Sequence, residues 1–99
     1  MKARIWNKSG WLSETREKEL DRIFDTMIKE AGFTVINVME HEFYPYGYTK
    51  LYLLSESHFA IHTFPEEKLA YYELSSCNKK YYDRFVSALS VLNTHVERE

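Results

Sequence analysis

Residues 48–63 read YTKLYLLSESHFAIHT, and the stretch holds two runs with the side-chain period of two that a β-strand requires. The first run covers residues 48–55. The second covers residues 57–63, where Phe59 and Ile61 fall on one side of the chain and two histidines on the other. Because the connection between the runs is so short, the sequence predicts an antiparallel hairpin.

Further strands flank this hairpin on both sides. The turn Tyr44-Pro45-Tyr46-Gly47 joins it to a preceding run that is rich in β-branched and apolar residues. A loop that begins at Pro65 follows it. The additional strands are predicted at residues 3–6, 34–43, 69–75 and 95–97.

One helix is predicted before these strands and a second one after most of them. Ser13 can cap the N-terminus of the first helix, and Gly32 can end it. The apolar side chains that recur at helical spacing in this segment are Leu20, Ile23, Phe24, Met27, Ile28 and Ala31. A similar apolar spacing over residues 82–92 predicts the second helix.

Strands grouped together, with one helix before and one after, indicate an α/β (α+β) two-layer sandwich. We expect a mainly antiparallel sheet with both helices on one face. The two faces of the central hairpin carry either large apolar residues or histidines, so neither face is purely solvated. A second sheet from another subunit is therefore expected to cover the face that the helices leave open.

Length and charge exclude several classes of protein. The chain has 99 residues and a mass of 11.9 kDa, so we expect a single domain over residues 1–99. The net charge of −2 and the pI of about 6.1 argue against a nucleic-acid partner. No apolar run is long enough for a membrane helix, and the lone Cys77 has no internal disulfide partner, so we expect a cytoplasmic location.

Residue types alone give only weak candidates for chemistry. Ser57 and His62 could form a nucleophile–base pair, but five residues apart on one strand they point to opposite faces. His58 and His62 share a face, yet no second pair of ligands stands at a suitable spacing, so no metal site is predicted. A lone cysteine such as Cys77 is more often an inert packing residue than a catalyst.

The segment ESHFAIHTFPE at residues 56–66 changes this picture. It resembles the core motif of the prokaryotic S-adenosylmethionine decarboxylase family, Glu-Ser-His-x-x-Ile-His-Thr-Trp-Pro-Glu, and departs from the named positions only at Phe64. The turn FYPYG at residues 43–47 is similar to the family's Phe-Leu-Pro-Tyr-Gly turn. Cys77 lies fifteen residues after His62, where the family carries its catalytic cysteine.

The resemblance implies that the chain processes itself. The Ser57 hydroxyl would attack the carbonyl of Glu56, convert the amide to an ester, and β-elimination would then split the chain. Residues 1–56 would become a β chain and residues 57–99 an α chain that begins with a pyruvoyl group made from Ser57. By the same resemblance, His62 serves the processing step. Thr49 aligns with a family serine whose hydroxyl assists it.

The resemblance also implies a reaction, the decarboxylation of S-adenosylmethionine to the aminopropyl donor for spermidine synthesis. The amine of this small-molecule substrate would form a Schiff base with the pyruvoyl group, which accepts the electron pair that carbon dioxide leaves behind. Cys77 would return a proton to the α-carbon. Phe43 would stack on the adenine ring, and Glu66 would hydrogen-bond the ribose hydroxyls. No metal is implied, and in the family these elements meet across a homodimer interface.

Departures from the family pattern leave two alternatives open. The family's Phe-Thr-Cys-Gly is SSCN at residues 75–78, and the chain ends near the last family strand, as expected of a short, phage-type member. Relatives with the same Glu-Ser-His core act on ornithine or arginine, although Phe43 and Glu66 favour the nucleoside substrate. The second alternative is a non-processing homologue that acts as a binding or partner module. The joint retention of Glu56, Ser57 and the downstream catalytic candidates argues against it.

Overall fold

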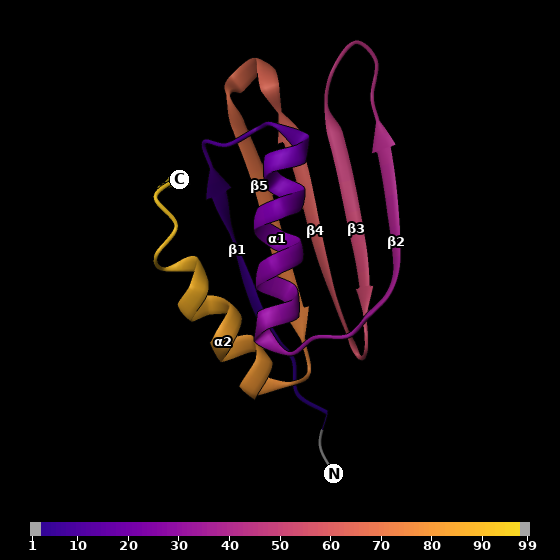
Figure 1. Cartoon of the computed structure of the whole chain (residues 1–99), viewed down its shortest axis with the longest axis vertical. Helices are drawn as coiled ribbons and strands as arrows, with labels where there is room; N and C mark the ends of the chain where they lie inside the picture. Colours follow the sequence, from indigo (N-terminus) through magenta and orange to yellow (C-terminus); the bar gives the residue numbers. More distant parts are fainter. Residues whose placement is uncertain (1–2, 98–99) are drawn as a thin grey trace.

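The computed structural model describes residues 3–97, which form one sheet and two α-helices (Figure 1). The strands in this part of the chain are β1 (Trp6–Leu12), β2 (Val35–Glu42), β3 (Tyr48–Leu54), β4 (Ser57–Phe64), β5 (Leu69–Ser76) and β6 (His95–Val96). The helices are α1 (Glu17–Ala31) and α2 (Lys79–Leu89), with a short 3-10 helix, η1 (Pro65–Glu67), between β4 and β5.

The strands form one antiparallel sheet in the order β2-β3-β4-β5-β1-β6. Both α-helices cover the same face of this sheet (Figure 1). The β3–β4 turn, the end of β5 and the start of α2 lie at one end of the molecule, whereas the β2–β3 loop and η1 lie at the other. The predicted two-layer sandwich is confirmed.

The hydrophobic core is the layer between the helices and the sheet. Phe24 of α1 is fully buried, and its ring centroid lies 4.8 Å from that of Phe59 on β4. Phe85 of α2 lies 5.2 Å from the same ring. Burying each of these rings contributes about 1.5–3 kcal/mol, which fixes both helices on the sheet. The predicted apolar face of α1 supplies buried Leu20, Phe24, Met27, Ile28 and Ala31.

Lys50 of β3 anchors α1 to the sheet from within this layer. Its ammonium nitrogen lies 3.0 Å from Asp21 Oδ1 and 3.5 Å from Asp25 Oδ1, both on α1, and its side chain is only 8% exposed. The Tyr52 hydroxyl donates to the same Asp25 oxygen at 2.5 Å. Burial and this carboxylate together raise the pKa of Tyr52, so its hydroxyl stays protonated.

The first helix begins later than the sequence predicts. It starts at Glu17, because Ser13 donates both its backbone N–H and its hydroxyl to the carbonyl oxygen of Thr94 and does not cap the helix. Glu14 supports the chain just before the helix, since its carboxylate accepts the backbone N–H of Arg16 at 2.9 Å and pairs with the guanidinium. This pairing holds the pKa of Glu14 down to about 2.

The other helix boundaries have clear local causes. Gly32 ends α1 as predicted, with a φ of 108° that favours glycine, and a Cβ there would lie 2.8 Å from the Tyr81 ring. The second helix covers Lys79–Leu89 and not 82–92. It begins earlier because the Asn78 side chain accepts the backbone N–H of Tyr81 at 3.0 Å and caps the first turn.

The first strand covers residues 6–12, so the predicted strand at 3–6 is wrong. The sequence NKSG at residues 7–10 has the composition of a loop. All seven residues of β1 nevertheless pair with β5, from Trp6 with Ser76 to Leu12 with Ala70. Pairing along the full length of a buried neighbour therefore overrides the weak local propensity.

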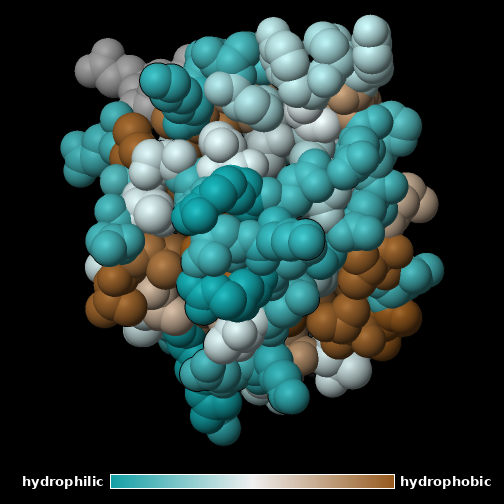
Figure 2. All heavy atoms as spheres, turned by 45° about the horizontal axis from the view of Figure 1, so that its top comes forward, coloured by the Kyte–Doolittle hydropathy of each residue, from teal (hydrophilic) through white to brown (hydrophobic). Residues whose placement is uncertain are grey.

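The face of the sheet opposite the helices is open and partly apolar. We call it the open face, and the strand register places on it Trp11, Met39, Leu51, Leu53, His62, Phe64 and Tyr71. Met39 is 69% exposed and Leu53 is 53% exposed. The helix side differs, because hydrophilic residues cover most of it and hydrophobic ones gather toward its two sides (Figure 2). Within residues 3–97, no helix is long and apolar enough to cross a membrane.

Candidate active site

The β3–β4 turn holds a strained residue next to the predicted cleavage point. Leu54 pairs with Ser57, so the turn between the strands consists of Ser55 and Glu56 alone. Glu56 has a φ of 58°, in the left-handed region that a residue with a side chain adopts at a cost of about 1–3 kcal/mol. The strain therefore falls on the residue that supplies the carbonyl of the Glu56–Ser57 bond.

Cys77 reaches this carbonyl from the end of β5. Its sulfur lies 2.5 Å from the backbone carbonyl oxygen of Glu56, and 4.0 Å from a carboxylate oxygen of the same residue. The thiol is the donor in the first contact. Cys77 directly follows Ser76, the last residue of β5, which pairs with Ser57 of β4. Sheet register therefore brings the predicted catalytic cysteine to the predicted cleavage bond, although 21 residues separate Cys77 from Glu56.

The Ser57 hydroxyl points to the opposite side of the sheet. Ser57 is only 8% exposed, and its Oγ donates to Ser76 Oγ at 3.1 Å. Ser76 is 1% exposed and belongs to the helix-covered side. Ser76 belongs to the SSCN segment that departs from the family pattern and is not among the predicted site residues. The alternation along β5 nevertheless offers a signal, because a residue next to Cys77 must face the other way.

His62 and Thr49 form the second predicted group. They are cross-strand partners on β3 and β4, and Thr49 Oγ1 lies 2.9 Å from His62 Nδ1. The imidazole also stacks on the ring of Tyr71 from β5, with centroids 6.3 Å apart and planes 27° from parallel. A hydroxyl on one ring nitrogen and an aromatic face along the ring fix the orientation of the imidazole. Tyr71 is a second residue that sequence reasoning missed.

The predicted substrate-binding residues lie beside this histidine. Phe43, Glu66, Thr49 and His62 all line one hollow of about 290 Å³, whose wall also includes Phe64. The Phe43 ring is half exposed and meets His41 edge-on at 4.5 Å. An exposed aromatic face and a carboxylate at the edge of the same hollow can bind a flat ring that carries hydroxyl groups.

The two groups lie at opposite ends of the sheet. Ser57 pairs with Leu54 at one end of the β3–β4 ladder, and His62 pairs with Thr49 five positions further along. At about 3.3 Å per residue, Ser57 and His62 stand about 16 Å apart along the strand. Direct proton transfer requires about 3 Å. Within one chain, the structure therefore joins Ser57, Glu56 and Cys77, and does not bring His62 to them.

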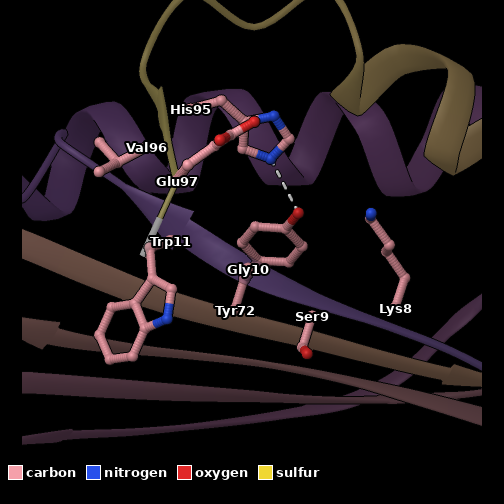
Figure 3. Close-up of a pocket in the computed structure, with 8 residues that line it drawn as sticks. All are labelled: Lys8, Ser9, Gly10, Trp11, Tyr72, His95, Val96 and Glu97. Carbon is pink, nitrogen blue, oxygen red and sulfur yellow. Dashed lines mark hydrogen bonds between the residues drawn. The ribbon is translucent and has the colours of Figure 1, made fainter. Parts of the chain in front are cut away.

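Another hollow holds none of the predicted site residues. It has a volume of about 830 Å³ and lies beside β1, where β6 pairs only with the last two residues of that strand (Figure 3). His95 Nε2 lies 2.8 Å from the Tyr72 hydroxyl in this hollow. Burial raises the pKa of Tyr72, so the phenol stays protonated, and its contact with His95 ties β6 to the sheet.

A smaller hollow between α1 and β2 is acidic. It measures about 310 Å³ and is lined by Glu17, Glu40 and Glu42 among others. Burial, followed by the neighbouring carboxylate of Glu42, raises the pKa of Glu17. Nowhere in residues 3–97 do three or more His, Cys, Asp or Glu side chains lie close enough to hold a metal ion together.

The chain is similar to known proteins over most of its length. The sequence profile described as S-adenosylmethionine decarboxylase matches residues 13–97. S-adenosylmethionine decarboxylase proenzyme 2 of Bacillus cereus is 40% identical over 73 residues, which are 69% of this chain and 59% of that protein. The S-adenosylmethionine decarboxylase proenzyme of Hydrogenobaculum sp. is 34% identical over 89 residues, which are 85% of this chain and 65% of that protein. The chain thus spans less than two thirds of the length of these curated relatives.

A solved structure supports the fold. The crystal structure of the adenosylmethionine decarboxylase from Aquifex aeolicus VF5 superposes with a TM-score of 0.68 at 24% identity. The match covers 91% of this chain and 83% of that one. The profile match extends over both groups of predicted site residues, from Phe43 to Cys77. The chain therefore belongs to the S-adenosylmethionine decarboxylase family.

Proposed function

We propose that this chain cleaves itself between Glu56 and Ser57 and then decarboxylates S-adenosylmethionine. The observation that carries the proposal is the geometry of one peptide bond. Glu56 holds a left-handed backbone, its carbonyl oxygen accepts from the Cys77 thiol at 2.5 Å, and the next residue carries the hydroxyl that would attack it. The curated relatives are named proenzymes, which fits an enzyme that matures by cleavage.

The cleavage consists of two steps. Ser57 Oγ forms a bond with the carbonyl carbon of Glu56, the bond from that carbon to the Ser57 nitrogen breaks, and the hydroxyl proton ends on the nitrogen. A base then removes the Ser57 Cα proton, and the new C-terminal carboxylate of Glu56 leaves. Addition of water and loss of ammonia convert the remaining residue to a pyruvoyl group. The products are residues 1–56 and residues 57–99.

Cys77 is suited to both the cleavage and the later reaction. In the uncleaved chain its thiol donates to the oxygen that becomes negative when Ser57 attacks, and such a donor stabilises the developing charge. After cleavage the Glu56 carboxylate leaves, and the thiol remains beside residue 57. The pyruvoyl group supplies an electron sink for the pair that carbon dioxide leaves behind. We assign to Cys77 the return of a proton to the substrate carbon, and a reduced thiol in that role agrees with a cytoplasmic location.

The hollow beside His62 favours a nucleoside substrate. Phe43 offers an exposed ring for an adenine to stack on, and Glu66 offers a carboxylate for ribose hydroxyls. Ornithine and arginine have neither an aromatic ring nor vicinal hydroxyls, so they would use neither the stacking contact assigned to Phe43 nor the ribose contact assigned to Glu66.

We further propose that the active enzyme is a homodimer whose subunits pack through their open faces. The 16 Å between Ser57 and His62 leaves each chain with two incomplete halves of a site. The open face carries His62 and its cross-strand partner Thr49, and Cys77 lies near this face at the end of β5. The exposed side chains of Met39 and Leu53 lie on the same face. A two-fold axis through this face would place one end of one sheet against the opposite end of its partner, and so would complete two sites.

Intact mass under denaturing conditions tests the first part of the proposal. The expected result is two species, residues 1–56 and residues 57–99 with an N-terminal pyruvoyl group. A single species at the full 11.9 kDa would overturn self-cleavage and support a binding or partner module. The Ser57→Ala variant is the control and should stay whole.

Release of carbon dioxide from labelled substrates tests the second part. The cleaved protein should act on S-adenosylmethionine and leave ornithine and arginine unchanged. Turnover of ornithine or arginine alone would contradict the assignment of Phe43 and Glu66. The Phe43→Ala variant should raise KM for S-adenosylmethionine and should still cleave itself, because the ring lies at the far end of the sheet from Glu56.

A further inference from the structure

We propose that Ser76 positions the nucleophile for self-cleavage, by holding the Ser57 hydroxyl in a fixed orientation against the end of β5. The inference rests on the proposed self-cleavage and concerns only its first step. Ser76 takes no proton and forms no bond in this role. It acts through Ser57, whose Oγ lies 3.1 Å from its own.

Hydrogen-bond accounting around Ser76 fixes the direction of this contact. The Ser76 hydroxyl donates its one proton to the carbonyl oxygen of Asn78 at 3.1 Å. It accepts the backbone N–H of Asn78 at 3.0 Å and the hydroxyl proton of Ser57 at 3.1 Å. A serine hydroxyl has one proton and two lone pairs, so Ser76 is saturated. Ser57 must therefore be the donor, and its own lone pairs stay available for attack.

Burial makes the contact a constraint on Ser57. Ser76 is 1% exposed and Ser57 is 8% exposed, so water is a poor substitute partner for either hydroxyl. An unpaired hydroxyl in such a place is unfavourable. The Ser57 side chain is therefore held in the one rotamer that reaches Ser76. Asn78 in turn is held, because its side chain caps α2 through Tyr81.

Consecutive residues at the end of β5 thus hold the two reacting groups from opposite sides. Ser76 contacts the nucleophile on the helix-covered side, and Cys77 contacts the carbonyl oxygen of Glu56 on the other. Ser76 is also the cross-strand partner of Ser57 in the sheet. The hydroxyl of Ser57 and the carbonyl oxygen of Glu56 therefore each have a fixed partner, and fixed orientation of two reacting groups favours their reaction.

The test compares cleavage rates of Ser76 variants by intact mass at successive times after synthesis. Ser76→Ala removes the hydroxyl. Ser76→Thr and Ser76→Val form a matched pair, because both add a branch of the same size and only threonine keeps a hydroxyl. Ser87→Ala, at an exposed position of α2, is the control for a serine that lies away from both the turn and the open face. Hydroxylamine is added to parallel samples, since it cleaves the ester but not the amide.

We expect Ser76→Ala and Ser76→Val to cleave at least about 10-fold more slowly than the unmodified chain, while Ser76→Thr stays within about 3-fold of it. Hydroxylamine should not speed the two slow variants, because they are slow before the ester forms. The Thr/Val comparison remains decisive even where the alanine variant folds poorly.

Two results would overturn the role of Ser76 alone. One is cleavage of Ser76→Ala and Ser76→Val at the rate of the unmodified chain. The other is rapid cleavage of the slow variants by hydroxylamine, which would place the defect after the attack of Ser57. In both, the unmodified chain and Ser87→Ala cleave normally, so the proposed function stands. An unmodified chain that never cleaves would overturn self-cleavage, and the role of Ser76 with it.

Discussion

Mixed dimers of two inactive variants should restore self-cleavage. Ser57→Ala lacks the nucleophile, and His62→Ala lacks the proposed base. Along β4 these residues stand five positions apart, or about 16 Å, roughly five times the reach of a direct proton transfer. A change of side-chain rotamer cannot close that gap. If His62 serves cleavage at all, the structure requires that it act on the Ser57 of a second chain.

The size of the effect follows from the two-fold arrangement. With equal co-expression, about half of all dimers contain one chain of each variant. In each mixed dimer one site combines both defects, and the other combines an intact Ser57 with an intact His62 of the partner subunit. Only the His62→Ala chain can then be cleaved. About half of the His62→Ala chains, or about a quarter of all chains, should therefore be cut.

Intact mass resolves the outcome, because the two variants differ in mass and yield different fragments. Each variant expressed alone provides the baseline, and a chain that carries both substitutions, co-expressed with the unmodified chain, is the matched control. In that control the double variant should stay whole. Cleavage of the mixed sample no higher than that of His62→Ala alone would refute the shared site and remove His62 from its processing role.

Three further predictions follow from contacts in the structure. Cys77→Ala should still split, but more slowly, and the split protein should decarboxylate at least about 100-fold more slowly than the unmodified enzyme in a carbon dioxide assay; normal turnover would exclude Cys77 as the proton donor. Lys50→Met should lower the free energy of unfolding in urea by about 2 kcal/mol, because it leaves the carboxylates of Asp21 and Asp25 without their cation; an unchanged midpoint would contradict this. Glu17→Gln should raise the Tm at pH 7, because burial and Glu42 raise the pKa of Glu17 in the folded state and the ionised form is disfavoured there. That gain should vanish as the pH falls below the ordinary value of 4.5, where Glu17 is protonated in both states, and a gain that persists there would have another cause.

Most of the fold could be predicted from the sequence because its signals are local. The alternation in β3 and β4 and the helical spacing before Gly32 each depend on residues that are close in the chain. β1 could not be found in this way, since its residues 7–10 have loop composition and become a strand only through pairing with β5. The predicted start of α1 was wrong for a similar reason, because Ser13 donates a hydrogen bond to Thr94 at the far end of the chain.

The candidate site also contains some features that local sequence predicts and others that depend on distant strand pairing. The motif at residues 56–66 contains Ser57 and His62 in one short segment, and the strand alternation already assigns them to opposite faces. An extended strand also moves them apart, since each residue between them adds about 3.3 Å to their separation. The contacts that place Ser76, Cys77 and Tyr71 depend on the register of β5 against β4, and register depends on the whole sheet.

The separation of Ser57 and His62 along β4 therefore bears on how two chains would assemble. In the proposed mechanism, the residues that the motif spreads along β4 form a compact site only if another copy of the strand supplies the missing part. Two copies that face each other in opposite directions satisfy this, because the β3–β4 turn with the Glu56–Ser57 bond at one end then lies against His62 of the partner subunit at the other. The open face carries His62 and the exposed apolar residues Met39 and Leu53. A dimer formed through this face would therefore bury apolar area and complete the site at the same time. In this arrangement self-cleavage depends on association, and dilution before maturation should slow the first step without changing the chemistry of the second.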